Sequence, residues 1–324
     1  MKSKNLYSYF KESFQKDHES YIEGSQRKTG FSVLDEQISL QNGLTILGAE
    51  TGMGKTTFAV NLSVNLAEAD ENILYFSLEQ GEYDFYTKVI SILEAHEKDT
   101  ALDFESLSAE DLKELTQKHQ AILERIHIVQ ANFGITLGEI TSTIDDFIST
   151  NNVKPIVFID YLQIILRNNS NGSREGIDQV VSGLKQYQNR KNLCMIVISS
   201  LNRANYGTRL SKESFKESGN IEYDADMVCG LQLQILDDPF FDQTGQQNEK
   251  RKRIEEEMAQ DIRKISFVSL KRRGKNPYFT CKLEFYPSKY LFRSEGMDDP
   301  FMRLVKEKNE ESKEQEINID EVDL

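Results

Sequence analysis

The 324-residue sequence predicts an α/β fold, a mainly parallel twisted sheet flanked by helices, with antiparallel strands near the carboxyl end. Between residues 29 and 226, short and continuously apolar segments alternate with amphipathic helical patterns, which is typical of a sheet buried on both faces. A glycine-rich turn stands at the first of these alternations. After residue 226, consecutive strand patterns replace the alternation, and this change favours antiparallel pairing.

The chain begins with a short amphipathic helix. Leu6, Phe10 and Phe14 lie four residues apart within 5–17 and therefore share one helical face. A helix of this length is not stable alone, so we expect it to lie on the body of its own chain or on a neighbouring subunit. A polar connector, residues 23–28, follows it.

The patterns divide the chain into one domain with two appendages. Residues 1–28 hold the helix and its connector, and 29–306 form the α/β domain. Within this domain, 240–262 is predicted to be a charged, solvated insertion of loop and helix. The segment 307–324 carries eight acids against two lysines and is predicted to be a flexible tail.

Strands and helices are predicted in regular order. Short apolar runs rich in branched and aromatic residues predict strands at 44–47, 73–76, 126–129, 156–159, 195–198, 228–236, 265–270 and 279–285. Helical patterns occupy 83–95, 108–123, 137–149 and 174–190, besides a helix after the first strand with apolar Phe58, Leu62 and Leu66. The turn 273–277 joins the last two strands.

The glycine-rich turn after the first strand fits the phosphate-binding loop pattern. It reads Gly48-Ala49-Glu50-Thr51-Gly52-Met53-Gly54-Lys55-Thr56-Thr57, with Ala49 in place of the first glycine. Small residues let backbone N–H groups curl around phosphates, and the following helix adds the positive end of its dipole. We expect 49–57 to bind ATP, with Lys55 on the β- and γ-phosphates and the Thr56 hydroxyl on Mg²⁺. A chance glycine-rich turn is the alternative, which the flanking strand and helix disfavour.

Two acids follow later strands. Asp160 ends the apolar run 155–160 at the carboxyl end of a strand, where α/β sheets bind ligands, and is the expected acid of the magnesium site. Glu79 follows the strand after the loop helix, so it would project over the same edge and orient water toward the γ-phosphate. The ordinary alternatives are an acid that caps the next element for Asp160 and a surface acid for Glu79.

Composition excludes several classes of protein. Hydrophobic residues make up 38% and charged residues 28% of the chain, which suits a large core and is unlike a disordered sequence. A net charge of −14 argues against a surface that coats nucleic acid or membrane, but it permits a locally basic groove. No apolar run reaches the roughly 18 residues of a membrane span. The amino terminus lacks the apolar block of a secretion signal.

The cysteines and histidines show no metal-ligand spacing. Cys194, Cys229 and Cys281 lie far apart in apolar stretches, without a CxxC pair. We therefore expect reduced core thiols in a cytoplasmic protein, with neither a disulfide framework nor a zinc site.

Together these motifs resemble the RecA-like motor domain of the DnaB family of replicative ring helicases. The resemblance runs from about Thr29 to Phe292. Besides the phosphate loop, its residues are Thr29-Gly30-Phe31, Leu34-Asp35, Ser77-Leu78-Glu79, Asp160-Tyr161-Leu162-Gln163, Leu201-Asn202-Arg203 and ESGNIEYDAD at 217–226. The phosphate loop is widespread, whereas DYLQ and ESGxIExDAD in this order are far more specific. The resemblance implies a RecA-like P-loop NTPase core with ATP and Mg²⁺ as cofactors.

The resemblance also implies catalytic roles. Glu79 would be the catalytic base, beside Lys55 and the magnesium-associated Asp160. Lys271 and Arg273 match the basic pair that reaches across the subunit boundary to the neighbour's γ-phosphate, where it neutralises transition-state charge. Without the resemblance, this pair would be interpreted as a solvated hairpin end.

A third set of residues matches a DNA-binding loop. Lys216, Glu217 and Gly219 correspond to the family's loop that lines the central channel and holds single-stranded DNA by its backbone. Glycine lets the main chain approach closely, and the lysine neutralises one phosphate. By itself, Lys216 would be one exposed charge among many.

Three features depart from the family. Ser200 stands where the family has a glutamine thought to sense the γ-phosphate, so we expect weaker coupling between hydrolysis and DNA grip. The basic pair lies one residue closer to Gly274 than usual. Only about 28 residues precede the motor, so we expect the helical amino-terminal collar that engages primase to be missing. The helix at 5–17 resembles the linker helix that docks on an adjacent subunit.

Two hypotheses of function follow. The first is an ATP-driven, ring-forming 5′→3′ DNA helicase or single-strand translocase, a homo-oligomer and expected hexamer, acting in replication of chromosomal, plasmid, phage or mobile-element DNA. Its partners would be single-stranded DNA and a replication initiator, loader or primase. The alternative is a DnaB-like oligomeric ATPase that serves as a scaffold, loader or switch, for example in phage defence, without processive unwinding. Ser200 and the expected absence of the collar mildly favour it.

Overall fold

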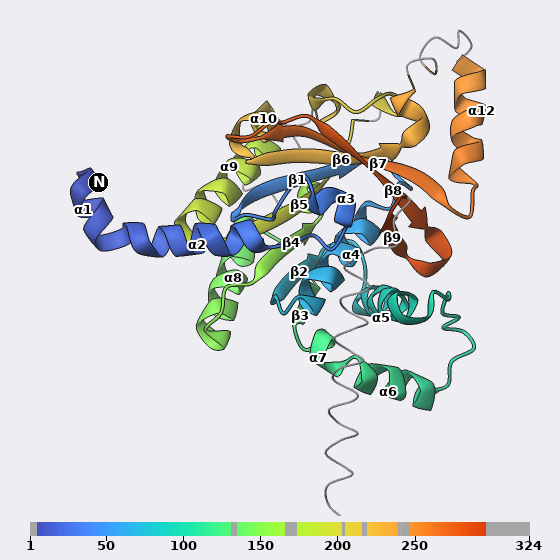
Figure 1. The fold of residues 1–324 in the computed structure, drawn as a ribbon, viewed down its shortest axis with the longest axis horizontal. Helices are drawn as coiled ribbons and strands as arrows, with labels where there is room; N and C mark the ends of the chain where they lie inside the picture. The colour runs from blue at the N-terminus through green and yellow to red at the C-terminus, as the bar shows by residue number, and fades with distance from the viewer. Residues whose placement is uncertain are drawn as a thin grey trace, which may run out of the picture.

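The computed structural model describes residues 5–130, 135–165, 174–202, 205–215, 219–238, 241 and 247–295. A nine-stranded sheet crosses them in the order β3-β2-β4-β5-β1-β6-β7-β8-β9 (Figure 1). The parallel strands are β1 (Gly43–Ala49), β2 (Ile73–Ser77), β3 (Ile126–Gln130), β4 (Ile156–Asp160), β5 (Cys194–Ser200) and β6 (Met227–Leu233). The antiparallel strands are β7 (Arg263–Arg272), β8 (Phe279–Tyr286) and β9 (Leu291–Ser294). The predicted fold class is confirmed.

Helices cover both faces of the sheet (Figure 1). One face carries α4 (Lys55–Glu68), α5 (Glu82–Lys98) and α7 (Gln120–Leu123), and the other carries α8 (Leu137–Asn151), α9 (Arg174–Lys191) and α10 (Gly219–Asp224). Successive strand residues point to opposite faces, so the strands serve two cores. Tyr75 and Phe158 lie in the core with α4 and α5, whereas Leu74 and Val157 lie in the core with α8 and α9. Such double burial explains why the parallel strands read as continuous apolar runs.

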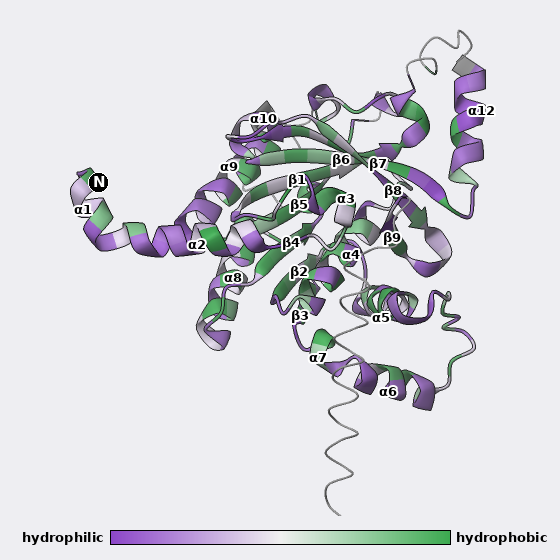
Figure 2. Cartoon of the chain, viewed as in Figure 1, coloured by the Kyte–Doolittle hydropathy of each residue, from purple (hydrophilic) through white to green (hydrophobic). Residues whose placement is uncertain are grey.

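The remaining elements are short. They are α3 (Ser32–Asp35), α6 (Ala109–Lys118), α12 (Gln247–Met258) and the single-turn helices η2 (Leu162–Ile164), η4 (Lys212–Phe215), η5 (Gln234–Asp237) and η6 (Pro287–Lys289). The insertion helix α12 is coloured almost wholly hydrophilic, in contrast to the apolar centre of the sheet (Figure 2). Among the described residues, no helix combines the length and apolarity needed to cross a bilayer.

The amino-terminal helix is longer than the sequence predicts. A continuous helical segment runs through α1 (Leu6–Tyr9), a π-helical turn η1 (Phe10–Phe14) and α2 (Gln15–Gln26). The predicted polar connector at 23–28 therefore begins as helix. The segment projects from the body (Figure 1), and its apolar residues Leu6, Phe10 and Phe14 are 85%, 61% and 42% exposed. Hence, this apolar face is not covered by the described part of its own chain.

Two further predictions differ in detail. The strand expected over 228–236 ends at Leu233, where the chain turns into η5. The helix expected over 108–123 is two helices, interrupted at His119. The last strand, β9, was not predicted from the sequence. The predicted tail at 307–324 lies outside the described residues and stays a prediction.

Candidate nucleotide-binding site

The phosphate-binding loop connects the end of β1 to the start of α4. Gly52 and Gly54 have left-handed φ angles of 85° and 82°, which a residue with a side chain rarely adopts. A Cβ at Gly54 would also lie 3.0 Å from the rings of Phe285 and Phe292. Both glycines are therefore required by the backbone of the turn. Lys55 then begins the helix, with its first N–H groups facing the loop.

A cavity of about 840 Å³ opens beside this loop. Its lining includes eight residues of the predicted site, namely Thr51, Gly52, Gly54, Lys55, Thr56, Thr57, Glu79 and Asp160. The side chains of Ala49 and Met53 are instead buried in the core, so these residues can face a ligand only through the backbone. Glu50 turns away, and its carboxylate accepts a hydrogen bond from the Gly207 N–H at 2.7 Å.

Asp160 combines burial with a restrained carboxylate. It is 3% exposed at the end of β4, and the Tyr75 hydroxyl donates to its Oδ2 at 3.1 Å. Burial raises the pKa of Asp160 to about 6, although hydrogen bonds with the side chains of Thr56 and Tyr75 oppose the rise. The bond between Thr56 and Asp160 places a hydroxyl and a carboxylate together. Hard oxygen donors of this kind fit Mg²⁺.

Besides Asp160, the described charged residues that line the cavity are Lys55, Glu79 and Arg263. Burial lowers the pKa of Lys55, and the negative charges of Asp160, Glu79 and Glu50 oppose this effect. Glu79 is exposed in the loop between β2 and α5. Lys55 thus shares the cavity with two acids, Asp160 and Glu79. This arrangement suits a ligand that is bound together with a cation.

Two contacts that the sequence did not predict restrain the phosphate loop. The Thr51 Oγ1 lies 3.3 Å from the Tyr206 hydroxyl, and the Arg263 guanidinium donates to the Gly52 carbonyl at 3.1 Å. From the insertion helix α12, the Met258 methyl group lies 3.0 Å from where a Cβ of Gly52 would stand. Neither Tyr206 nor Arg263 belongs to a recognisable motif, so no local signal could have identified them.

Ser200 and Gln163 share a wall of the cavity. The backbone N–H of Ser200 donates to the Gln163 Oε1 at 3.2 Å, and the Gln163 Nε2 donates to the Ser199 Oγ at 3.0 Å. Although Ser200 replaces the glutamine expected by resemblance, the amide of Gln163 lies beside it in this wall.

The basic pair lies at the amino ends of the parallel strands, opposite the carboxyl ends where the cavity opens. Met227, at the start of β6, pairs with Arg272 at the end of β7, whereas the phosphate loop follows the end of β1, which runs parallel to β6. Lys271 donates to the carbonyls of Glu222 and Tyr223, and Arg273 donates to the Tyr223 carbonyl at 3.0 Å. The structure therefore does not bring the pair to its own chain's cavity. The predicted contact with a neighbour's nucleotide stays a prediction.

The predicted DNA loop is only partly described. Lys216 and Glu217 lie outside the described residues, and Gly219 begins α10. The Lys212 ammonium, which precedes the loop, lies 2.9 Å from the carboxylate of Glu222, which follows it. An ion pair therefore joins the two stems of the loop.

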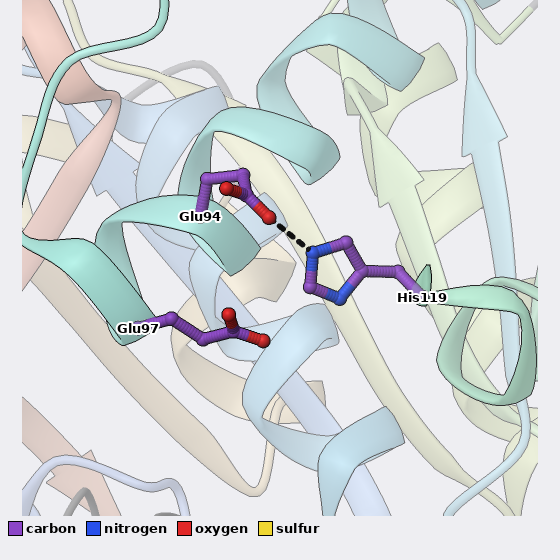
Figure 3. Close-up of side chains that lie close together, drawn as sticks. All are labelled: Glu94, Glu97 and His119. Carbon is purple, nitrogen blue, oxygen red and sulfur yellow. Dashed lines mark hydrogen bonds and ion pairs between the residues drawn. The ribbon is translucent and has the colours of Figure 1, made fainter. Parts of the chain in front are cut away.

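A second cluster of ionisable groups lies away from the cavity (Figure 3). Glu94 and Glu97 on α5 converge with His119, and their ligand atoms lie within 4.8 Å of one another. Lys118 bonds both carboxylates, and Lys98 bonds Glu94 at 2.9 Å. Although burial opposes it, hydrogen bonds from Lys118, Lys98 and His119 lower the pKa of Glu94 to about 2. Because the ammonium groups of Lys98 and Lys118 already pair with the two carboxylates, we interpret the cluster as an ion network that fixes α6 to α5.

The three cysteines lie in the interior of the protein. Cys194, Cys229 and Cys281 are free and buried, as expected for core residues.

Comparison with known proteins assigns the family. Residues 27–294 match the model of the DnaB-like helicase C terminal domain. The chain belongs to this family. It is 28% identical over 229 residues to replicative DNA helicase DnaC of Bacillus subtilis (strain 168), covering 68% of this chain and 49% of that protein. It is 26% identical over 265 residues to replicative DNA helicase DnaB of Buchnera aphidicola subsp. Baizongia pistaciae (strain Bp), covering 79% of this chain and 53% of that protein. The chain thus spans about half the length of these relatives.

Solved structures share the fold. An ATPase domain superposes with a TM-score of 0.66 at 21% identity, covering 88% of this chain and 98% of that domain. A DnaB-like replicative helicase, solved in a study of its interactions with primase, superposes with the same TM-score at 22% identity. It covers 87% of this chain and 67% of the solved chain.

Proposed function

We propose that the DnaB-like chain is an ATP-hydrolysing motor that assembles into a ring and moves along single-stranded DNA. One observation carries the proposal: Lys55, Asp160 and Glu79 line one cavity at the carboxyl edge of the parallel sheet. Family membership supports it, since the relatives are named replicative DNA helicases. A hexameric ring, 5′→3′ movement and a role in DNA replication follow the resemblance.

The cavity suggests how ATP is held. The Lys55 ammonium, the loop N–H groups and the dipole of α4 bind the phosphates. Thr56 and Asp160 would hold Mg²⁺, which neutralises charge on the β- and γ-phosphate oxygens. Glu79, exposed at the cavity, orients the attacking water and accepts its proton.

The remaining charge in the transition state is neutralised by a second copy. Lys271 and Arg273 lie at the opposite edge of the sheet from the cavity. In line with the resemblance, they would act on the nucleotide of a neighbouring subunit. Such a residue raises turnover only in an assembled oligomer. Initiator, loader and primase partners are part of the same proposal.

The DNA contact is placed at Lys216, Glu217 and Gly219. Repeated copies of this loop would hold phosphates without reading bases, so binding would be salt-sensitive and tolerant of sequence. The net charge of −14 is compatible with it, because only the channel needs local positive charge.

ATPase assays with and without single-stranded DNA test the proposal. We expect DNA to stimulate turnover, and Lys55→Ala to abolish both turnover and unwinding of a forked duplex. Glu79→Gln should retain nucleotide binding and lose at least about a hundredfold in turnover. Glu82→Gln, which changes an exposed acid on the first turn of α5, is the matched control. Turnover that is indifferent to DNA, or unwinding that survives Lys55→Ala, would refute the motor.

The second candidate is an ATP-bound scaffold or switch. Ser200 in the cavity wall favours it, because the family's phosphate-sensing glutamine is replaced there. Under this alternative, oligomer assembly requires ATP, and partner capture is unaffected by Glu79→Gln. Unwinding by the wild type together with its loss in Glu79→Gln would decide for the motor.

A further inference from the structure

The basic pair at the far edge of the sheet is held by its own chain. Lys271 donates to the carbonyl oxygens of Glu222 and Tyr223, and Arg273 shares the second of these. Both carbonyls belong to the last turn of α10, where a helix leaves carbonyls unpaired and carries its negative dipole end. The carboxyl end of α10 is therefore a cradle for two cations.

A carboxylate completes this cradle. Asp226 Oδ1 lies 3.3 Å from the Arg273 Nε, and the Asp226 carbonyl accepts from the Arg273 N–H at 2.8 Å. The other carboxylate oxygen accepts from the Leu44 N–H at 2.8 Å and from the Lys185 ammonium at 2.5 Å. Asp226 is thus fixed to β1 and α9 while it holds the guanidinium. A charged anchor of this kind sets the orientation of a mobile arginine side chain.

The same short helix follows the predicted DNA loop. α10 begins at Gly219, the last residue of that loop, and ends three residues before Met227, the start of β6. The ion pair between Lys212 and Glu222 ties the preceding stem of the loop to the turn that carries the cradle. Lys212, which precedes the loop, is therefore joined through α10 to the basic pair of the same subunit.

We propose that Asp226 is a positioning residue for Arg273 and fixes its guanidinium at the carboxyl end of α10. This inference rests on the proposed function, in which Arg273 acts on the neighbour's ATP. Its consequence is directional: loss of the Asp226 charge in one subunit slows hydrolysis in the adjacent subunit's cavity, not in its own.

Asp226→Asn tests the positioning role. Asparagine keeps an oxygen for the Leu44 N–H but loses the charge that holds Arg273. We expect kcat for DNA-stimulated ATP hydrolysis to fall about tenfold, since small misplacements of a catalytic group have effects of this size or larger. KM for ATP should stay within about twofold, because Asp226 does not line the cavity. Asp70→Asn, which breaks an aspartate–arginine pair with Arg125 elsewhere, is the matched control.

Mixing subunits separates positioning from a structural defect. A Lys55→Ala subunit has no functional cavity but offers an intact Arg273. Added to Asp226→Asn, it should restore turnover per Asp226→Asn subunit, because the restored seams combine an intact cavity with an intact basic pair. Arg273→Ala mixed with Lys55→Ala is the reference for such rescue.

Each outcome decides one point. If Arg273→Ala is rescued but Asp226→Asn is not, or if Asp226→Asn turns over like wild type, the positioning role is wrong. If neither variant is rescued, the shared site fails, and the proposed function fails with it. Should Asp226→Asn fold poorly because Lys185 is left buried and unpaired, Asp226→Asn/Lys185→Gln removes both charges and is read in the same way.

Discussion

The buried carboxylate of Asp160 should make the nucleotide-free protein less stable than a variant without a charge at this position. Burial raises its pKa from the ordinary 3.8 to about 6, so the folded state favours the protonated acid. At pH 7.5 the group is charged in both the folded and the unfolded state, so the cost of desolvating the carboxylate opposes folding. Asp160→Asn keeps the shape and removes the charge. We expect this variant to be more stable than the wild type at neutral pH.

The size of the effect follows from the two pKa values. Each pKa unit corresponds to about 1.4 kcal/mol, so a rise from 3.8 to about 6 destabilises the fold by about 3 kcal/mol above pH 6. The sign is that of a raised acid: stability from this group is highest below pH 4 and falls as pH rises through 6. Asparagine can still accept from the Tyr75 hydroxyl, so this hydrogen bond is kept. The gain in stability is then at most the cost of the buried charge, about 3 kcal/mol.

Urea unfolding between pH 4 and 8 measures this difference. The gain of Asp160→Asn should approach its full size at pH 7.5 and vanish near pH 4. With Mg²⁺ and an ATP analogue at a hundred times its Kd, the wild type should gain about 2.7 kcal/mol by mass action. The variant should gain far less. A variant less stable than the wild type at pH 7.5, or a difference independent of pH, would show that burial does not raise the pKa of Asp160 as described above.

Other predictions concern the fold around the site. Glu94→Gln should destabilise the protein by up to about 3 kcal/mol at pH 7. This loss should shrink as pH falls from 4.5 toward 2, because the pKa of Glu94 is about 2 in the fold. Urea unfolding at pH 7 and pH 3 measures the loss, and a chelator should not reproduce it. Gly48→Ala should cost about 1–3 kcal/mol and weaken DNA stimulation of the ATPase, because a Cβ would lie 2.4 Å from the Phe215 ring just before the DNA loop; thermal unfolding and ATPase assays test it. Tyr75→Phe removes a donor to Asp160 and should weaken binding of Mg²⁺-nucleotide more at pH 6 than at pH 8, as titration with a fluorescent analogue would show.

Local sequence signals located the parallel half of the sheet and the loop on it. Strands buried on both faces read as unbroken apolar runs, and the turn needs glycines at its left-handed positions, Gly52 and Gly54. β9 was not predicted, because four residues after a single turn show no usable period. The helix beyond residue 17 was also missed, since the residues of α2 form no apolar stripe.

The contacts that complete the site escaped prediction for a different reason. Arg263 and Tyr206 reach the phosphate loop across more than 150 positions of chain, so only the folded sheet brings them there. Asp226 belonged to a recognised motif, but its bond to Arg273 follows from the pairing of β6 with β7. Residues at strand ends are predictable by type, whereas their partners depend on strand order.

Lys55 and Arg273 lie at opposite ends of the parallel strands. Under the proposed function, every copy therefore binds one nucleotide and offers its basic pair to the nucleotide of the next copy. In an open row of copies, the cavity at one end has no neighbouring Arg273, and the Arg273 at the other end has no neighbouring nucleotide. Joining the two ends removes both losses together. Closure of the ring should therefore raise the rate of ATP hydrolysis per subunit in one step. Measuring this rate distinguishes an open assembly, which has two ends, from a closed one.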